Sequence, residues 1–340
     1  MLKKLKILSV TTLVIPLLYS PSFAMDSQLD GSLESISNVS LDATYHPLEG
    51  NLPGETTEGD SENIFLLDSG ELKIEVPKDS DSPVSIEDSN SRTLITMPTE
   101  EGASDAQVVA DSVAGFEGIN YDSYTSLKET GDLQFSTAIK NINAPSEYEY
   151  NFVLPEGEKF SKVDKYIVVL DSKGEISAVI DEPWAKDAAG KTVPTFFDIR
   201  DNKLVQHVDH KSGEYAYPII ADPVYSRGII SQVVTEQWTA KTHWHIAIKV
   251  TLKARALWGV GQMDKVYRDG LADLREHHPR SMSSESMAQQ WECHVVGLPA
   301  TRTIDLESIR PSNPQWRDRI PTIQQIVREG KKPIYDTCNW

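Results

Sequence analysis

The stretch YIVVLDSKGEISAVI, residues 166–180, contains two short runs of mainly apolar, β-branched residues separated by a turn sequence. The turn is Asp171-Ser172-Lys173-Gly174. Aspartate side chains bond the nearby backbone, and glycine adopts positive φ without steric cost. Two such runs joined by a short glycine-containing turn predict an antiparallel β-hairpin. This hairpin sets the pattern for the residues around it.

The same pattern extends over residues 105–222. We expect strands at 133–140, 148–154, 163–170, 175–180, 193–199, 204–208 and 215–220, separated by turns such as Pro155-Glu156-Gly157 and Asp187-Ala188-Ala189-Gly190. Strands at this spacing predict an antiparallel sandwich. Upstream, alternation at 72–76 and apolar runs at 84–86 and 94–96 predict further strands. No strand, glycine-rich loop and helix follow one another, so nucleotide binding has no support.

The last third of the chain has a different composition. Residues 226–340 hold both cysteines, six of the seven tryptophans and five of the eight histidines. They carry 16 Lys/Arg against 12 Asp/Glu, a net charge of +4, whereas residues 25–225 carry 14 against 39, a net charge of −25. Such asymmetry indicates two parts with different roles, one of them suited to an anionic partner.

The N-terminus predicts export. Lysines at positions 3, 4 and 6 precede an apolar stretch at 7–18, and Ser22-Phe23-Ala24 supplies small residues for cleavage between Ala24 and Met25. A membrane anchor is the weaker reading, because a span needs about 20 apolar residues. We therefore expect a signal peptide at 1–24, whose removal shifts the formal charge from −18 to −21. Residues 25–62, acidic and poor in aromatic residues, are expected to form a disordered leader.

Export determines how the cysteines are interpreted. In an oxidising compartment two cysteines usually pair, so we expect a Cys293–Cys338 disulfide. It would close a loop of about 45 residues, for which the chain-entropy model gives about 4 kcal/mol as an upper figure. A nucleophilic Cys293 beside His294 is the less favoured alternative, because adjacent side chains rarely point the same way.

Three motifs in the β region carry a family resemblance. They are YNFVLPEG at 150–157, EPWAKDAAG at 182–190 and Tyr217-Pro218-Ile219-Ile220-Ala221-Asp222-Pro223. Together they resemble an uncharacterised module of secreted proteins of Gram-positive bacteria, in which the last motif often precedes a variable C-terminal domain. The resemblance covers about 90 residues and implies a carrier segment at 63–222, without known catalytic residues.

The C-terminal third resembles a second family, a domain of unknown function in similar exported proteins. The matching positions are Met287, Gln290, Cys293-His294, Asp305-Leu306-Glu307, Arg310-Pro311 and Cys338-Asn339. The family pattern is Q-x-x-C-H, then W-x-L-E-x-x-R-P, then C-N, and Ile304 here replaces the tryptophan. The resemblance supports the disulfide and a domain at 226–340, and implies no activity.

Taken by itself, the C-terminal domain is predicted to be small and mixed α/β. We expect strands at 229–235 and 244–252, and helices at 262–278, from Ser283/Ser284 to Trp291, and from Asn313 to Glu329. In the second strand, Trp244, Ile246, Ile248 and Val250 alternate with polar residues and predict the buried face.

Three groups of residues could carry chemistry. His243 and His245 lie two apart on one strand face, and His277, His278 or His294 could complete a metal site with them. Solvated histidines are the simpler interpretation, and we expect no metal or other cofactor.

The second group could serve acid–base catalysis with an anion clamp, and it consists of His294, Glu307 and Arg310. A structural ion pair between Glu307 and Arg310 is the simpler interpretation.

The third group is a basic and aromatic surface. Its members are Lys241, Lys249, Lys253 and Arg255 with Trp238, Trp244 and Trp258. Such a surface could bind an anionic polymer or lipid head groups, although a tryptophan-rich core with a solvated basic face would show the same composition. We therefore expect a secreted binding module for a cell-wall polymer, an anionic membrane or another cell. The alternative is a secreted hydrolase or nuclease-like effector, whose partner would be nucleic acid.

Overall fold

The computed structural model describes residues 60–68, 72–88, 91–128, 131–163, 165–240, 242–296, 303–319, 338 and 340, and the backbone of Thr57–Glu58. The predicted signal peptide, its cleavage site at Ala24 and Met25, and most of the predicted leader lie outside these residues. So do Lys241 and most of the helix expected to run from Asn313 to Glu329. Within the described residues, no helix is both long and apolar enough to cross a membrane.

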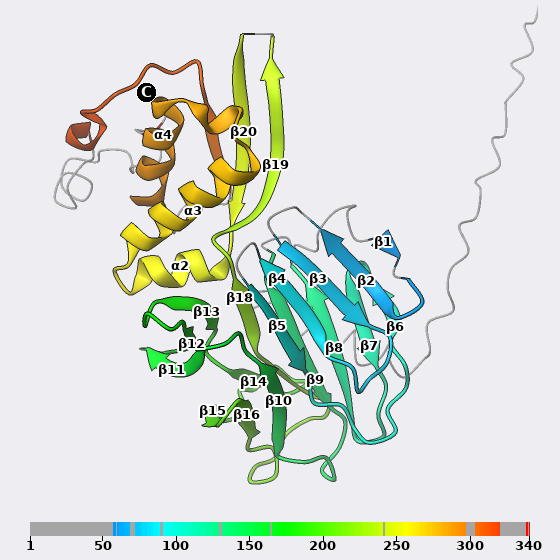
Figure 1. Ribbon diagram of the computed structural model, residues 1–340. Helices are drawn as coiled ribbons and strands as arrows, with labels where there is room; N and C mark the ends of the chain where they lie inside the picture. The colour runs from blue at the N-terminus through cyan, green and yellow to red at the C-terminus, as the bar shows by residue number, and fades with distance from the viewer. Residues whose placement is uncertain are drawn as a thin grey trace, which may run out of the picture.

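The first large sheet has eight strands in the order β1-β2-β3-β4-β5-β10-β16-β15. The strands are β1 (Thr57–Glu58), β2 (Asn63–Asp68), β3 (Leu72–Pro77), β4 (Val84–Asp88), β5 (Ser91–Thr96), β10 (Glu147–Val153), β15 (Thr195–Arg200) and β16 (Lys203–Val208). The three predicted upstream segments are thus strands of this sheet (Figure 1).

The second large sheet runs in the order β11-β12-β13-β18-β9-β8-β7-β6, with β17 pairing both β9 and β14. Its strands are β6 (Gln107–Ala110), β7 (Val113–Phe116), β8 (Tyr121–Leu127), β9 (Leu133–Ile139), β11 (Lys159–Val163), β12 (Tyr166–Leu170), β13 (Ile176–Ile180), β14 (Trp184–Lys186), β17 (Ile219–Asp222) and β18 (Val224–Arg227). The hairpin predicted at residues 166–180 is β12–β13.

A single apolar core lies between the two sheets. Ile74 and Ile95 of the first sheet and Phe135 of the second are at most 1 % exposed and belong to it. Tyr150 packs against Phe135 with ring centroids 6.0 Å apart. The antiparallel sandwich predicted from the strand pattern is therefore confirmed, since all strand pairs of the described residues in these sheets are antiparallel.

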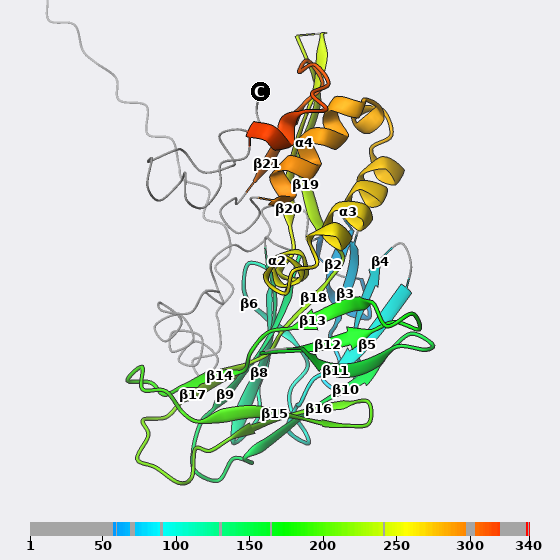
Figure 2. The same ribbon diagram turned by 90° about the vertical axis from the view of Figure 1, so that its left-hand side faces the viewer.

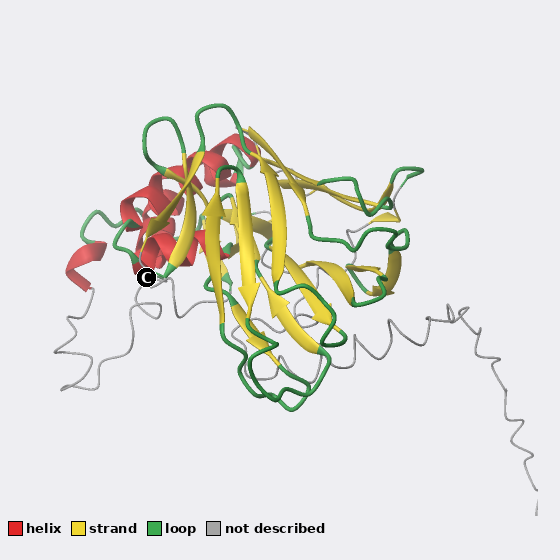
Figure 3. Cartoon of the chain, turned by 90° about the horizontal axis from the view of Figure 1, so that it is seen from below, coloured by secondary structure: helices red, strands yellow, loops and turns green. Residues whose placement is uncertain are grey.

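The C-terminal region is small and mixed α/β, as predicted. Its elements are β19 (Ile230–Thr239), β20 (His243–Val250), α2 (Leu252–Gly259), α3 (Met263–His277), η2 (Ser281–Ser283), α4 (Glu285–Val296), β21 (Ile304–Glu307) and η4 (Trp316–Arg319). The three strands form one sheet in the order β19-β20-β21. Figure 2 shows α3 and α4 lying along these strands, and Figure 3 shows the helices gathered at one side of the sandwich.

The C-terminal region shares a core with the sandwich. Val168 and Val179 of the second sheet pack in the same cluster as Ile246, Leu257 and Trp291. Asp132, in the turn between β8 and β9, adds a polar link, because its carboxylate accepts the Leu252 N–H at 3.1 and 3.2 Å, at the start of α2. Apolar packing and hydrogen bonds therefore both cross the junction at residues 222–226.

Several predicted boundaries move for identifiable reasons. The strand expected at 215–220 begins only at Ile219, because Pro218 has no N–H to donate to a ladder. The strand expected at 244–252 ends at Val250. There the Thr251 hydroxyl accepts the Ala254 N–H at 3.2 Å and caps α2, a helix that the pattern did not predict.

Candidate functional site

The β19–β20 hairpin projects beyond the rest of the described molecule, away from the two large sheets (Figure 1). Its ladder pairs Ile230 with Val250 at the base and Thr239 with His243 near the tip. The register shifts between Ile230 and Gln232 and again between Val233 and Thr235, as at β-bulges, which increase local twist. The hairpin tip is thus carried by a long, paired stalk.

Two tryptophans lie directly opposite each other near this tip. Trp238 of β19 pairs with Trp244 of β20, and their rings meet edge to face with centroids 5.3 Å apart. Trp238 is 48 % exposed, whereas Trp244 is half-buried. The Trp244 N–H donates to the Ser308 hydroxyl at 2.8 Å, and the Ser308 N–H donates to the Trp244 carbonyl at 2.9 Å. The exposed Trp238 indole therefore packs against Trp244, whose main chain is held by hydrogen bonds to Ser308.

The tip is otherwise polar. The Thr242 N–H and hydroxyl both donate to the Thr239 carbonyl, at 3.0 and 3.1 Å, and close the turn. Ala240 has φ of 48°, the left-handed region that non-glycine residues seldom adopt. The Thr242 hydroxyl also lies 2.8 Å from His243 Nδ1. Hydroxyl and imidazole groups thus border the tryptophan pair.

The outer face of the three-stranded sheet brings together residues that the sequence placed in separate groups. His245 lies directly opposite Glu307 in the β20–β21 register, and its Nε2 is 3.1 Å from Asp305 Oδ1. Glu307 in turn forms an ion pair with Arg310, with Oε2 and Nη2 2.5 Å apart. These side chains are at least partly exposed, so the face is a solvated row of acidic and basic groups.

The histidines considered as metal ligands have other contacts. His277 Nδ1 lies 3.2 Å from Asp273, and His278 Nδ1 lies 2.8 Å from Glu236. Burial alone would raise the pKa of Glu236, but hydrogen bonds from His278 and Ser281 hold that pKa below its ordinary value. His243 and His245 gain no third ligand, since no group of three potential ligands occurs in the described part of the chain.

Two members of the acid–base group are in direct contact. Glu307 and Arg310 meet as the ion pair described above, and Arg310 Nη1 also donates to the Trp340 carbonyl at 2.9 Å. His294 lies on α4 and is 4 % exposed. The ion pair thus belongs to the packing around the chain end, which matches the simpler interpretation of these residues.

The basic surface requires a correction. Lys253 is 6 % exposed and belongs to α2 rather than to an extended β20, so it is not a surface residue. Burial lowers its pKa to about 8. Arg255 and Trp258 also lie on α2, and the Trp258 indole donates to the Val296 carbonyl at 3.1 Å. Of the described basic candidates only Lys249, half-buried, stays on the hairpin with Trp238 and Trp244.

The predicted disulfide is confirmed. Cys293 and Cys338 are bonded, with Cα atoms 5.5 Å apart, across a separation of 45 residues. The bond packs in a small cluster with Trp316, against which Val296 and Trp340 also lie. The Trp340 indole donates to the Pro311 carbonyl at 2.9 Å, so the last residue of the chain is held at two points.

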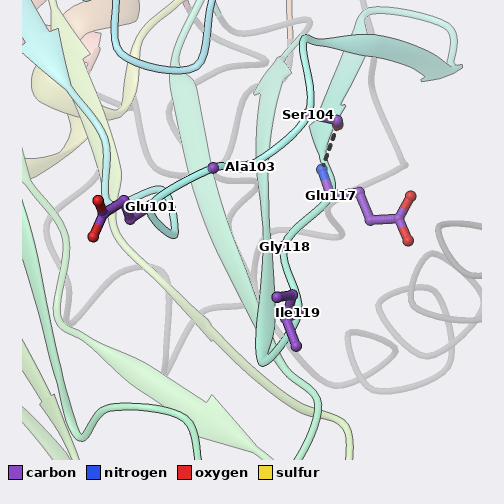
Figure 4. A pocket seen from close by; sticks show the side chains of 7 residues that line it. Glu101, Ala103, Ser104, Glu117, Gly118 and Ile119 are labelled. Carbon is purple, nitrogen blue, oxygen red and sulfur yellow. Dashed lines mark hydrogen bonds between the residues drawn. The ribbon is translucent and has the colours of Figure 1, made fainter.

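A shallow pocket lies far from these residues, on the sandwich. It has a volume of about 240 Å³ and is lined by Glu101, Gly102, Ala103, Ser104, Glu117, Gly118 and Ile119. The Ser104 hydroxyl accepts the Glu117 N–H at 2.9 Å, while the two glutamate carboxylates point away from each other (Figure 4). Its polar groups therefore do not converge on a common point, as those of a binding site do.

Comparison with known proteins adds no assignment: no family model, curated protein or solved structure matches the chain. The site is thus defined by its own geometry. Sequence reasoning named Trp238 and Trp244 as candidates, but it did not predict the contact of Asp305 with His245 or that of Ser308 with Trp244. The alternation of apolar and acidic residues at 304–307 is a period-two signal that could have revealed β21.

Proposed function

We propose that the protein is a binding module that contacts an anionic lipid surface through the tip of the β19–β20 hairpin. One observation carries the proposal: an exposed tryptophan, Trp238, stacks edge to face on Trp244 near the tip of a projecting hairpin. The Trp238 indole is thus available to a partner, and its apolar ring and polar N–H suit a surface that is partly apolar and partly wet.

Tryptophan suits the boundary between lipid and water. Its ring is apolar, but its indole N–H needs a polar partner, and tryptophans therefore gather at the head-group level of membranes. The hairpin presents this ring with Thr239, Thr242 and His243 around it. These polar groups would stay hydrated among the head groups while the indole enters the apolar boundary.

The charge distribution supports the same orientation. The C-terminal part carries a net charge of +4, and the preceding part carries −25. The hairpin points away from the two large sheets (Figure 1). A negative surface would attract the C-terminal end and repel the sandwich, so the hairpin would approach first. Export, which the N-terminal sequence predicts, would bring the protein to such a surface outside the cell.

Co-sedimentation with lipid vesicles tests this proposal. We expect the protein to bind phosphatidylcholine vesicles that contain phosphatidylglycerol, and to bind vesicles of phosphatidylcholine alone more weakly. Binding should weaken as salt rises from about 50 to 200 mM, because screening shortens the reach of the electrostatic attraction.

A matched pair of variants tests whether vesicle binding depends on the hairpin tip or on any exposed aromatic side chain. Trp238→Ala should lower vesicle affinity by about tenfold, which corresponds to about 1.4 kcal/mol. Phe196→Ala is the control, since Phe196 of β15 is 58 % exposed but lies on the sandwich. Equal loss in both variants, or binding only to wall polymer or nucleic acid, would contradict a lipid-binding tip.

A further inference from the structure

The bond between Asp222 and Pro223 has an unusual place in the fold. It is the only Asp–Pro bond in the sequence, and it connects β17 to β18 within the second sheet. Both strands pair with β9, through Ala221↔Thr137 and Val224↔Gln134. The Phe135 N–H donates to the Pro223 carbonyl at 3.0 Å. The bond is therefore held on both sides by ladder pairing.

The Asp222 side chain is buried and oriented. It is 1 % exposed, and its Oδ2 accepts the Gln134 Nε2 donor at 2.5 Å. Burial raises the pKa of Asp222 well above its ordinary value, against the opposing effect of the Gln134 hydrogen bond, and the neighbouring Asp181 acts in the same direction as burial. Burial therefore favours the protonated carboxyl, the form that carries a proton to give away.

A side-chain amide lies near the main-chain carbonyl of Asp222 and is shared with the Thr195 hydroxyl and the Trp184 carbonyl. Gln206 of β16, fully buried, places Nε2 3.4 Å from the Asp222 carbonyl oxygen and 3.2 Å from the Thr195 hydroxyl. A donor at this position would stabilise negative charge that develops on the carbonyl oxygen. Gln134 Oε1, Gln206 Oε1 and the Ser136 hydroxyl nearby are buried without a hydrogen-bond partner among the described residues. Buried polar atoms left in this way call for a functional or solvent-related explanation.

We propose that this site cleaves its own chain between Asp222 and Pro223. A carboxyl oxygen of Asp222 attacks the carbonyl carbon of the same residue, and a five-membered cyclic anhydride forms. The carboxyl proton passes to the nitrogen of Pro223, and the bond between the Asp222 carbonyl carbon and that nitrogen breaks. Water then opens the anhydride, leaving Asp222 as a C-terminal residue with two carboxyl groups and Pro223 with a free secondary amine. The net reaction consumes one water molecule.

Proline is a suitable leaving group here. Its nitrogen has no hydrogen to donate to the sheet, so protonation of that nitrogen breaks no ladder hydrogen bond. Gln134 holds the carboxyl, and Gln206 polarises the carbonyl, so the fold supplies orientation that an unfolded Asp–Pro sequence lacks. The cut would separate the acidic part of the chain from the part that carries a net charge of +4.

The two pieces would stay together after cleavage in the folded protein. Pairing of β17 and β18 with β9, and the core shared by Val179 and Trp291, persist without the covalent link. Cleavage is therefore detected only under denaturing conditions. This activity does not depend on the proposed membrane contact, because neither Trp238 nor Trp244 takes part.

Intact-mass spectrometry of the purified full-length chain, denatured after prolonged incubation at neutral pH, tests the proposal. We expect two fragments, one ending at Asp222 and one starting at Pro223, whose summed mass exceeds the intact mass by one water. Asp222→Asn, which imitates the neutral acid in shape, should leave the chain uncut. Gln206→Leu should slow cleavage by about 100-fold, as the loss of one oxyanion donor does.

Three results would overturn it. The first two are a wild-type chain that keeps a single intact mass and an Asp222→Asn variant that is cut at the wild-type rate, as a contaminating protease would do. Wild-type protein kept unfolded in urea at the same pH controls for the intrinsic lability of the bond. Cleavage there at the folded rate would show that the fold contributes nothing and would equally contradict the proposal. Circular dichroism of each variant shows whether it has folded. If Asp222→Asn has not folded, Asp222→Glu takes its place, because it keeps the acid but lengthens the ring of the cyclic anhydride.

Discussion

The side-chain amide of Gln290 pairs with the main chain of Glu307 on both sides of the residue. Gln290 Nε2 donates to the Glu307 carbonyl at 3.0 Å, and its Oε1 accepts the Glu307 N–H at 3.0 Å. The Gln290 amide thus pairs with the main-chain N–H and carbonyl of Glu307 at the edge of β21, as an additional strand would. Gln290 is fully buried on α4, so it joins the helix to the sheet that carries the hairpin.

Gln290→Leu should destabilise the protein by about 2 to 4 kcal/mol, because it leaves two main-chain groups without partners in a buried place. Urea unfolding measures the change. Gln237→Leu is the matched control, since Gln237 is exposed on β19 and should change stability little. Similar losses in the two variants would show that the Gln290 contacts contribute nothing specific.

Replacing both Cys293 and Cys338 by alanine should lower the free energy of unfolding by at most about 4 kcal/mol, the chain-entropy figure for a loop of this length. Alkylation of the native, non-reduced protein should modify no cysteine, and reduction should expose both. Two alkylated cysteines in the native protein would contradict the bond.

Arg227→Met should be strongly destabilising, by about 3 to 5 kcal/mol, as when one partner of a buried ion pair is removed. Arg227 is 3 % exposed and lies 2.9 Å from both Asp88 and Glu158, two partly buried carboxylates that would lose their cationic partner. Arg200→Met is the control, since Arg200 pairs with Glu147 at the surface and should matter little. Thermal unfolding of the two variants gives the comparison, and similar melting temperatures would count against a buried network.

Stability should rise with pH between about 7 and 10. Burial lowers the pKa of Lys128 to about 7 and that of Lys253 to about 8, from 10.5. Unfolding therefore takes up protons in this window, so the free energy of unfolding increases with pH and the gain is absent below it. Above pH 10 the effect reverses, because burial raises the pKa of Tyr121 to about 12 and the unfolded chain loses its tyrosine protons first.

Lys253→Met checks this account within the same urea unfolding series. It should raise stability at neutral pH and flatten part of the slope, because no amine then has to be neutralised on burial. Loss of stability at pH 7, or an unchanged slope, would show that the buried Lys253 amine does not cause the dependence.

The pattern of β-branched and aromatic runs between turns predicted many strands of the sandwich. Residues 148–154 are the clearest case, because β10 alternates between buried and more exposed residues along its length, and the structure confirms this strand. Strand β8 shows why others were missed. Its sequence YDSYTSL contains polar residues that are all buried, with Asp122 satisfied by Lys140 at 2.7 Å and Ser123 by the Pro98 carbonyl. Those partners are distant in sequence, so local pattern could not indicate burial.

The disulfide could be predicted because only two cysteines exist and export favours their pairing. The site could be predicted only in part. Trp238 and Trp244 were recognisable as aromatic residues, but their direct opposition depends on two register shifts within β19–β20. The position of His245 opposite Glu307 depends on β21, which follows helices α2, α3 and α4 in the chain. Lys253 was misplaced because the strand pattern continued past Thr251, which in fact caps α2.

Tryptophan fluorescence with brominated lipids tests the central claim most directly, because bromine quenches only indoles that reach the acyl chains. In vesicles containing phosphatidylglycerol, the wild-type protein should be quenched, and Trp238→Phe/Trp244→Phe should lose that quenching although it keeps Trp184 and the buried Trp291. Equal quenching of the double variant and the wild type, or none in either at low salt, would contradict the claim that the hairpin tip inserts into lipid.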